Sequence, residues 1–312
     1  MTVTNTLLRL LVLAAIFVNG WTDAPNAIAT AVGSGALTFR RAVGLATLCN
    51  FAGAAVSCSF LPTVAATVGE LVTFADGQAA LNALCAAMLS IILWATAAWR
   101  FGLPTSESHA LLAGLSGAAL ALGSADLNGA AWLKTIGGML ISLGAGAAAA
   151  RLFRLALPKD SSGTVFWQRF SAGSMAFLHG AQDGQKFMAL LLMADTLDGN
   201  GSSPLLPMLL LTAGCMAFGT ALGGRPIVKK VGFELSKLTP TEGLAADLGA
   251  GSVLLICSVL GLPVSTTHAR VAAVCGAGKD PDLRILSQIG GAWLLTFPCC
   301  GLLSFLLTRL MT

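Results

Sequence analysis

Asp23 and Asp183 lie within long apolar stretches of this 312-residue chain. A carboxylate in hydrocarbon is costly unless a cation, a proton or several hydrogen-bond donors lie beside it. Amide and hydroxyl side chains near both residues would complete an oxygen cage suited to Na⁺. We therefore expect a cation site, although each carboxylate could instead cap a broken helix, and Asp183 could pair with Lys186. The candidate ligands are Asp23, Asp183, Asn19, Thr22 and Gln182.

Two segments combine a proline with hydroxyl side chains, at Pro104–His109 and Pro263–His268. Proline interrupts a helix, and the helix that follows begins with free N–H groups. Such an N-terminus with hydroxyls beside it favours a bound oxyanion. The alternative is that these hydroxyls simply cap structural helices. The candidate oxyanion ligands are Thr105, Ser106, Ser108, Ser265, Thr266, Thr267, Asn26 and Gln185.

Ionisable residues accompany both segments. Glu107 stands where the second segment has Thr266. A carboxylate beside an anion repels it unless a proton or a cation is bound, so Glu107 is a further candidate for coupling to H⁺ or Na⁺. His109 and His268 are expected to support the broken backbone, with a proton relay as the alternative. Lys186 either neutralises Asp183 or attracts the anion.

The chemistry-bearing segments occur twice. Phe17–Asp23 matches Phe177–Asp183, and Leu103–Ala110 matches Leu262–Ala269, at offsets of 160 and 159 residues. Two motifs at nearly one offset predict an internal duplication. We expect a first repeat at 1–157, a connecting cytoplasmic loop at 158–165 and a second repeat at 166–312.

The elements that carry these motifs are predicted to be membrane helices. Only 10% of the residues are charged and 55% are hydrophobic, so a soluble surface is excluded. A spanning helix needs about 20 apolar residues. About ten candidate spans follow: 7–32, 42–62, 79–100, 101–123, 130–152, 166–193, 204–222, 241–260, 261–277 and 285–309. Helix interruptions are expected at 19–26, 104–109, 179–186 and 263–268.

The charges of the loops predict how the repeats are oriented. The loop around Arg40 is basic, whereas its counterpart at 194–203 has no Lys or Arg. The loop at 63–78 has no Lys or Arg either, whereas its counterpart at 223–240 has four such residues. Since cytoplasmic loops are enriched in Lys and Arg, the repeats are expected to be inverted, with both termini extracellular. The segments at 101–123 and 261–277 are either crossings or re-entrant hairpins.

Two further features concern packing. The spacing of Ile227, Val231, Leu235 and Leu238 predicts an amphipathic helix, either on the membrane surface or as an ordinary loop helix. The pair Gly219-x-x-x-Gly223 is typical of closely approaching membrane helices.

The motifs resemble those of the PiT family of inorganic phosphate transporters. Gly20–Asn26 resembles the family's G-A-N-D-x-x-N segment, and His179–Lys186 resembles its second copy, H-G-A-N-D-x-x-K. The P-x-S-T-T-H loop is intact at Pro263–His268 and altered at Pro104–His109, and Lys237–Pro240 followed by Gly243 also matches. The chain departs from the pattern at Thr22, Gln182, Pro25 and Glu107.

The resemblance implies an all-α symporter that moves phosphate with Na⁺ or H⁺ across a cell membrane by alternating access, as a homodimer. It implies that Asp23, Asn26 and Asp183 serve the cation and phosphate sites. No cofactor, nucleic-acid partner or enzymatic activity is expected. The alternatives are a permease for sulfate or another oxyanion, a passive anion channel, and an intramembrane enzyme or structural subunit.

Overall fold

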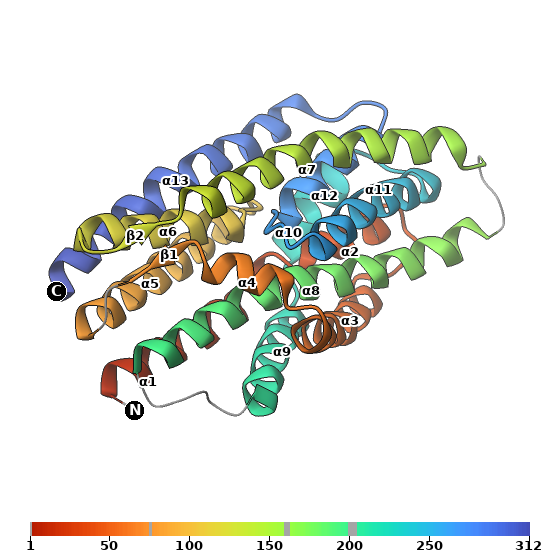
Figure 1. Ribbon diagram of the computed structural model, residues 1–312. Helices are drawn as coiled ribbons and strands as arrows, with labels where there is room; N and C mark the ends of the chain where they lie inside the picture. Colours follow the sequence, from red (N-terminus) through yellow and green to blue (C-terminus); the bar gives the residue numbers. More distant parts are fainter. Residues whose placement is uncertain (1, 75–76, 159–162, 199–204) are drawn as a thin grey trace.

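The protein is an all-α bundle, shown in Figure 1 as a computed structural model that describes residues 2–74, 77–158, 163–198 and 205–312. Residues 159–162 of the predicted connection, and part of the predicted loop 194–203, lie outside this description. The elements are α1 Val3–Thr22, α2 Pro25–Gly33, α3 Phe39–Phe60, α4 Thr63–Gly69, β1 Val72–Thr73, α5 Gln78–Arg100, α6 Glu107–Leu122, β2 Asp126–Leu127, α7 Gly129–Ala156, α8 Thr164–Asp198, α9 Leu205–Leu222, α10 Arg225–Lys229, the π-helical turn η1 Lys230–Glu234, α11 Pro240–Val259, α12 Thr266–Ala277 and α13 Leu283–Met311.

Many of these helices are long and apolar enough to cross a membrane, as expected for a polytopic protein. By length and composition, seven helical segments within the described residues meet this requirement: α1 with α2, α3, α5, α7, α9, α11 and α13. The helices α6 and α12 have 16 and 12 residues. At about 1.5 Å per residue they are shorter than the hydrocarbon core of about 30 Å.

Three of the four predicted interruptions are confirmed. The first helix ends at Thr22, and α2 begins at Pro25, whose missing N–H costs nothing in the first turn. The chain is also non-helical before α6 and before α12, where Ser106 and Ser265 are the N-caps.

The fourth predicted interruption, at 179–186, is wrong. The helix α8 runs without a break from Thr164 to Asp198. This stretch contains no proline, and a helix places Asp183 and Lys186 on one face, where they pair. Pro25 in the first copy has no counterpart here, which explains why only that copy is broken.

The helices of the two halves pack in corresponding pairs. α6 packs on α13 and α12 packs on α7, whereas α8 packs on α3 and α1 packs on α9. Glycines allow the last two contacts: a Cβ on Gly53 would lie 2.0 Å from the Phe177 carbonyl oxygen, and one on Gly219 would lie 2.0 Å from that of Phe17. The expected close approach at Gly219 is therefore confirmed.

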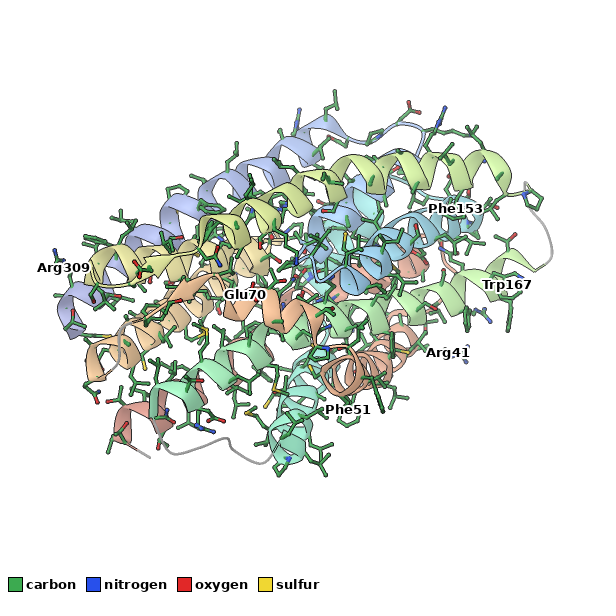
Figure 2. All side chains as sticks on the ribbon, viewed as in Figure 1. Arg41, Phe51, Glu70, Phe153, Trp167 and Arg309 are labelled. Atoms are coloured by element: carbon green, nitrogen blue, oxygen red, sulfur yellow. The ribbon has the colours of Figure 1, made fainter. Side chains whose placement is uncertain are left out.

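The two chain termini and the middle of the chain lie at opposite ends of the bundle. In Figure 1 the N- and C-termini lie toward one end, whereas α7 ends and α8 begins at the other. Figure 2 places Arg309 near the first of these ends, and Arg41 and Trp167 toward the second.

Within the segment 225–238, residues 225–234 fold as α10 and η1, residues 235–238 are non-helical, and the apolar face points into the protein. Ile227, Val231 and Leu235 are fully buried, and they belong to a hydrophobic cluster with residues of α2 and α11. The membrane-surface interpretation is therefore wrong, because this face is covered by other helices.

Candidate ion and anion site

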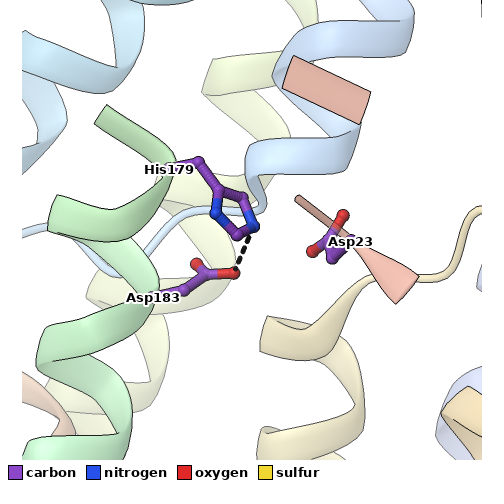
Figure 3. Close-up of side chains that lie close together, drawn as sticks. All are labelled: Asp23, His179 and Asp183. Carbon is purple, nitrogen blue, oxygen red and sulfur yellow. Dashed lines mark ion pairs between the residues drawn. The ribbon is translucent and has the colours of Figure 1, made fainter. Parts of the chain in front are cut away.

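Asp23 and Asp183 meet in the interior, as Figure 3 shows. Both are buried, and each has a ligand-competent atom within 4.8 Å of the other's and of a His179 ring nitrogen. Asp23 comes from the break between α1 and α2, whereas His179 and Asp183 are one turn apart on α8. The motifs of the two halves thus contribute to one site.

Neutral donors surround the Asp23 carboxylate. The Asn26 amide donates to its Oδ1 at 2.7 Å, and the Thr267 hydroxyl donates to the same oxygen. The Thr266 hydroxyl donates to Oδ2 at 3.3 Å. The proline-initiated turn of the second half therefore lies directly against the helix break of the first half.

A cation accompanies Asp183 instead. Lys186 Nζ lies 2.6 Å from Asp183 Oδ1, and the Asn19 amide donates to Oδ2 at 2.9 Å. The ammonium group also donates to Ser108 Oγ and to the Val264 carbonyl, each at 2.7 Å. Lys186 is 2% exposed, so this ion pair is shielded from solvent. Ser108 and Val264 belong to the two proline-initiated segments, which lie next to each other.

His179 also belongs to the site, although it is not among the ligands predicted from the sequence. Its Nε2 lies 3.4 Å from Asp183 Oδ2, and its Nδ1 lies 2.8 Å from Asn50 Oδ1. Asn50 in turn donates to Thr220 on α9. The repeat offset points to this residue, because His179 is the counterpart of the candidate ligand Asn19.

Three amide oxygens at the site have no hydrogen-bond partner within the described part of the chain: Asn19 Oδ1, Asn26 Oδ1 and Gln182 Oε1. An unpaired buried acceptor is costly. Together with the two carboxylates, these amide oxygens are the kind of ligand that a hard cation prefers.

The hydroxyls that begin α6 and α12 have two kinds of role. Ser106 and Ser265 accept from the backbone N–H of His109 and His268, so they act as N-caps. Ser108, Thr266 and Thr267 instead contact Lys186 or Asp23. Thr105 is buried beside them.

Three candidate residues have partners of other kinds. The Gln185 side chain accepts from the Val64 and Ala65 N–H groups and donates to the Ala181 carbonyl, so it anchors the start of α4. The Thr22 hydroxyl donates to the Val18 carbonyl of its own helix. The Gln182 amide nitrogen donates to Ser258 Oγ at 3.0 Å and to the Leu262 carbonyl at 3.3 Å.

Glu107 is buried, and neither carboxylate oxygen has a hydrogen-bond partner among the described residues. The rings of His109 and His268 meet edge to face, with centroids 4.4 Å apart. They therefore join the starts of α6 and α12 but contact neither Asp23 nor Asp183 through any hydrogen bond that the structure describes.

Comparison with known proteins agrees with these features. Residues 19–164 and 151–304 match the model of the phosphate transporter family. A probable low-affinity inorganic phosphate transporter of Bacillus subtilis is 31% identical over 92% of this chain and 90% of that protein. A protein of the same description from Rhizobium meliloti is 33% identical, covering 93% and 91%.

A solved structure described as the sodium-dependent phosphate transporter has the same fold, with a TM-score of 0.86, 20% identity and 99% of each chain covered. The predicted resemblance is thus confirmed by family model, relatives and fold. The chain belongs to the phosphate transporter family.

Proposed function

We propose that this protein is a secondary active symporter that moves inorganic phosphate with Na⁺ or H⁺ across a cell membrane by alternating access. The observation that carries the proposal is the buried contact between motifs of the two halves, in which Thr266 and Thr267 donate to Asp23 while Lys186 donates to Ser108. The relatives described as phosphate transporters support phosphate as the substrate.

The charges of the site favour coupled transport. Asp23, Asp183 and Glu107 supply up to three negative charges, whereas Lys186 supplies one positive charge. Phosphate brought into this interior would be repelled unless cations or protons entered with it. Cation binding and phosphate binding should therefore be mutually favourable.

The proposed cation site comprises Asp23 and Asp183 with the oxygens of Asn19, Gln182 and Thr22. The similar structure's description as sodium-dependent favours Na⁺ as its ion. Phosphate would lie at the starts of α6 and α12, where the first N–H groups and the hydroxyls of Ser108, Thr266 and Thr267 converge. Asn26, Thr105, Ser106 and Ser265 would complete this shell, while Gln185 would position α4 beside it.

The corresponding packing of the halves supports two inverted repeats, at 1–157 and 166–312, joined at 158–165. Counting α6, α8 and α12 with the seven long segments gives ten, and the short helices would reach mid-membrane from opposite sides. Both termini would then be extracellular, and a homodimer is the proposed assembly.

Uptake into proteoliposomes tests the proposal. We expect labelled phosphate to accumulate under an imposed Na⁺ or H⁺ gradient, and Asp23→Asn to abolish this accumulation. Asp126→Asn is the matched control, since Asp126 is an exposed carboxylate in β2, outside the motifs. Phosphate uptake that ignores both gradients would indicate a channel, and uptake suppressed by excess sulfate would indicate a broader oxyanion permease.

A further inference from the structure

A pocket of about 470 Å³ lies between α7 and α13, outside the proposed ion and phosphate sites. Its walls are four residues between Ile136 and Leu143 on α7 and four between Gly290 and Phe297 on α13, and its other lining residues are His109 and His268. We call it the histidine pocket. Each half supplies one histidine and four residues at the same helical spacing, so the pocket lies where the two halves meet.

The histidine pocket opens toward the surrounding lipid. Leu140 and Leu294, one from each wall, are 66% and 79% exposed. These helices are among the segments proposed to cross the membrane, so their exposed apolar faces contact hydrocarbon. No Asp, Glu, Lys or Arg of the described residues lines the pocket. A ligand that enters it must therefore be uncharged and soluble in the bilayer.

The deep end of the pocket contains polar atoms that lack partners. His268 is 2% exposed, and neither of its ring nitrogens has a hydrogen-bond partner within the described residues. Nδ1 of His109 likewise has none there. Leaving such a buried group unpaired is costly, and a lipid tail cannot provide the missing hydrogen bond. A neutral imidazole offers one donor and one acceptor.

Aromatic rings surround these nitrogens. The Trp293 indole packs at a tilt of 49° against the His268 ring with centroids 3.9 Å apart, and the Phe297 ring centroid lies 5.4 Å from that of His109. Such faces and edges favour another aromatic ring over a saturated chain. The volume is in the range of small-molecule sites.

We propose that the histidine pocket binds a neutral, lipid-soluble phenol, whose ring packs against Trp293 and Phe297 and whose hydroxyl bonds the imidazoles of His109 and His268. A hydroxyl group suits this position because it both donates and accepts. The proposal is independent of the transported ion, since none of its contacts involves Asp23, Asp183 or Lys186.

Photolabelling of the reconstituted full chain tests this inference. The probe is 4-hexylphenol carrying a diazirine on its alkyl chain, in phosphatidylcholine vesicles, with labelled positions identified by peptide mass spectrometry. We expect saturable labelling at 136–143 and 290–297 that excess unlabelled 4-hexylphenol displaces. The same probe without its hydroxyl should label lipid-facing positions without saturation.

Substitutions separate pocket binding from general partitioning into lipid. Met139→Trp places a second indole opposite Trp293 and should eliminate the saturable labelling. Ile141→Trp adds the same group to the same helix at a 67% exposed position outside the pocket and should leave labelling unchanged. His268→Phe keeps a ring but loses the hydrogen bonds, and should weaken displacement by 4-hexylphenol about fivefold.

Size-exclusion chromatography and thermal unfolding confirm that each variant is folded. His109→Phe is the second test if His268→Phe does not fold. Labelling that never saturates, that spreads evenly over the exposed faces of α7 and α13, or that survives Met139→Trp would overturn the proposal. An absence of labelling at the pocket, as expected if a second copy of the chain covered it, would overturn it too.

Discussion

Asp23 and Asp183 occupy equivalent positions, but their partners differ in charge. Three neutral donors contact Asp23, whereas the Lys186 ammonium group contacts Asp183. The charge of Asp183 is therefore largely balanced by the protein itself, and that of Asp23 is not. In the proposed mechanism the coupling cation would therefore be needed mainly at Asp23, whereas Lys186 contacts Asp183, Ser108 and the Val264 carbonyl before α12.

Glu107 is the residue at which proton coupling can be tested separately. Its carboxylate is buried without hydrogen-bond partners among the described residues, a state that is stable only when a proton or a cation neutralises it. Glu107→Thr installs the residue that the second half has at this position. We expect phosphate uptake driven by a proton gradient to be lost, while phosphate binding persists.

The matched control for this prediction is Glu70→Gln, which removes an exposed carboxylate. Equilibrium binding of labelled phosphate and gradient-driven uptake are measured for both variants. If Glu107→Thr retains uptake driven by the proton gradient at the level of Glu70→Gln, Glu107 carries no proton in the cycle.

Residue types and their duplication allowed most of the site to be predicted. The motifs predict Asp23, Asn26, Thr266 and Thr267 as site residues, and these four contact one another in the structure. Gln185 also belongs to a motif, but its amide anchors α4, because the first N–H groups of that helix need an acceptor. Such a partner depends on how helices pack, and sequence spacing alone does not reveal it.

At the scale of the elements, glycines set the distance between paired helices. A Cβ on Gly219 would lie 2.0 Å from the Phe17 carbonyl oxygen of α1, which no rotamer change relieves. Gly219→Ala should therefore force α9 away from α1 and destabilise the protein by about 1–3 kcal/mol. Thermal unfolding in detergent measures the effect.

Gly214→Ala on the same helix is the control, because no described atom of another helix would lie within 4 Å of the methyl group that this substitution adds. It should be neutral or stabilising by up to about 1 kcal/mol, since alanine is the better helix former. Equal unfolding temperatures for the two variants would contradict the close-packing explanation.

A buried ion pair joins four elements that no sequence motif had connected. Arg270 on α12 lies 2.5 Å from Asp247 Oδ1 on α11 and donates to the Asn26 and Ala27 carbonyls of α2. Ser171 on α8 donates to the other Asp247 oxygen at 2.6 Å. The first half has apolar Leu111 and Met88 at the corresponding positions. The first half therefore lacks an equivalent ion pair, and this network anchors α2 to helices of the second half.

Arg270→Leu should lower stability by about 3–5 kcal/mol, because it leaves the Asp247 carboxylate buried without its cation. The double variant with Asp247→Met copies the residues of the first half and should recover much of this loss. A double-mutant cycle in thermal unfolding measures the coupling. Strictly additive effects of the two substitutions would show that the pair is not a unit.

At the scale of the whole molecule, the sequence predicted the membrane class and the pairing of motifs but not the continuity of α8. The hydrophobic pattern and the polar residues are similar at 19–26 and at 179–186. Composition therefore does not reveal that the helix is broken in the first segment and continuous in the second. The difference lies in Pro25, which ends one helix and begins another, whereas Lys186 and Asp183 pair along an intact helix. The two halves are therefore equivalent in packing but not in backbone conformation.

The proposed inversion can be tested in equivalent connections of the two halves. Ser124 lies between α6 and α7, and Lys279 lies between α12 and α13; both side chains are exposed. If the halves are inverted, these connections lie on opposite sides of the membrane, with Lys279 in the cytoplasm by its charge.

Ser124→Cys should react with an impermeant maleimide in intact cells, whereas Lys279→Cys should react only after permeabilisation. The unsubstituted chain gives the background from its eight native cysteines. Labelling of both positions from the same side would show that the halves are parallel. In that case α6 and α12 would approach the site from the same side of the membrane. The proposal that two opposed helix N-termini bind phosphate would then be wrong.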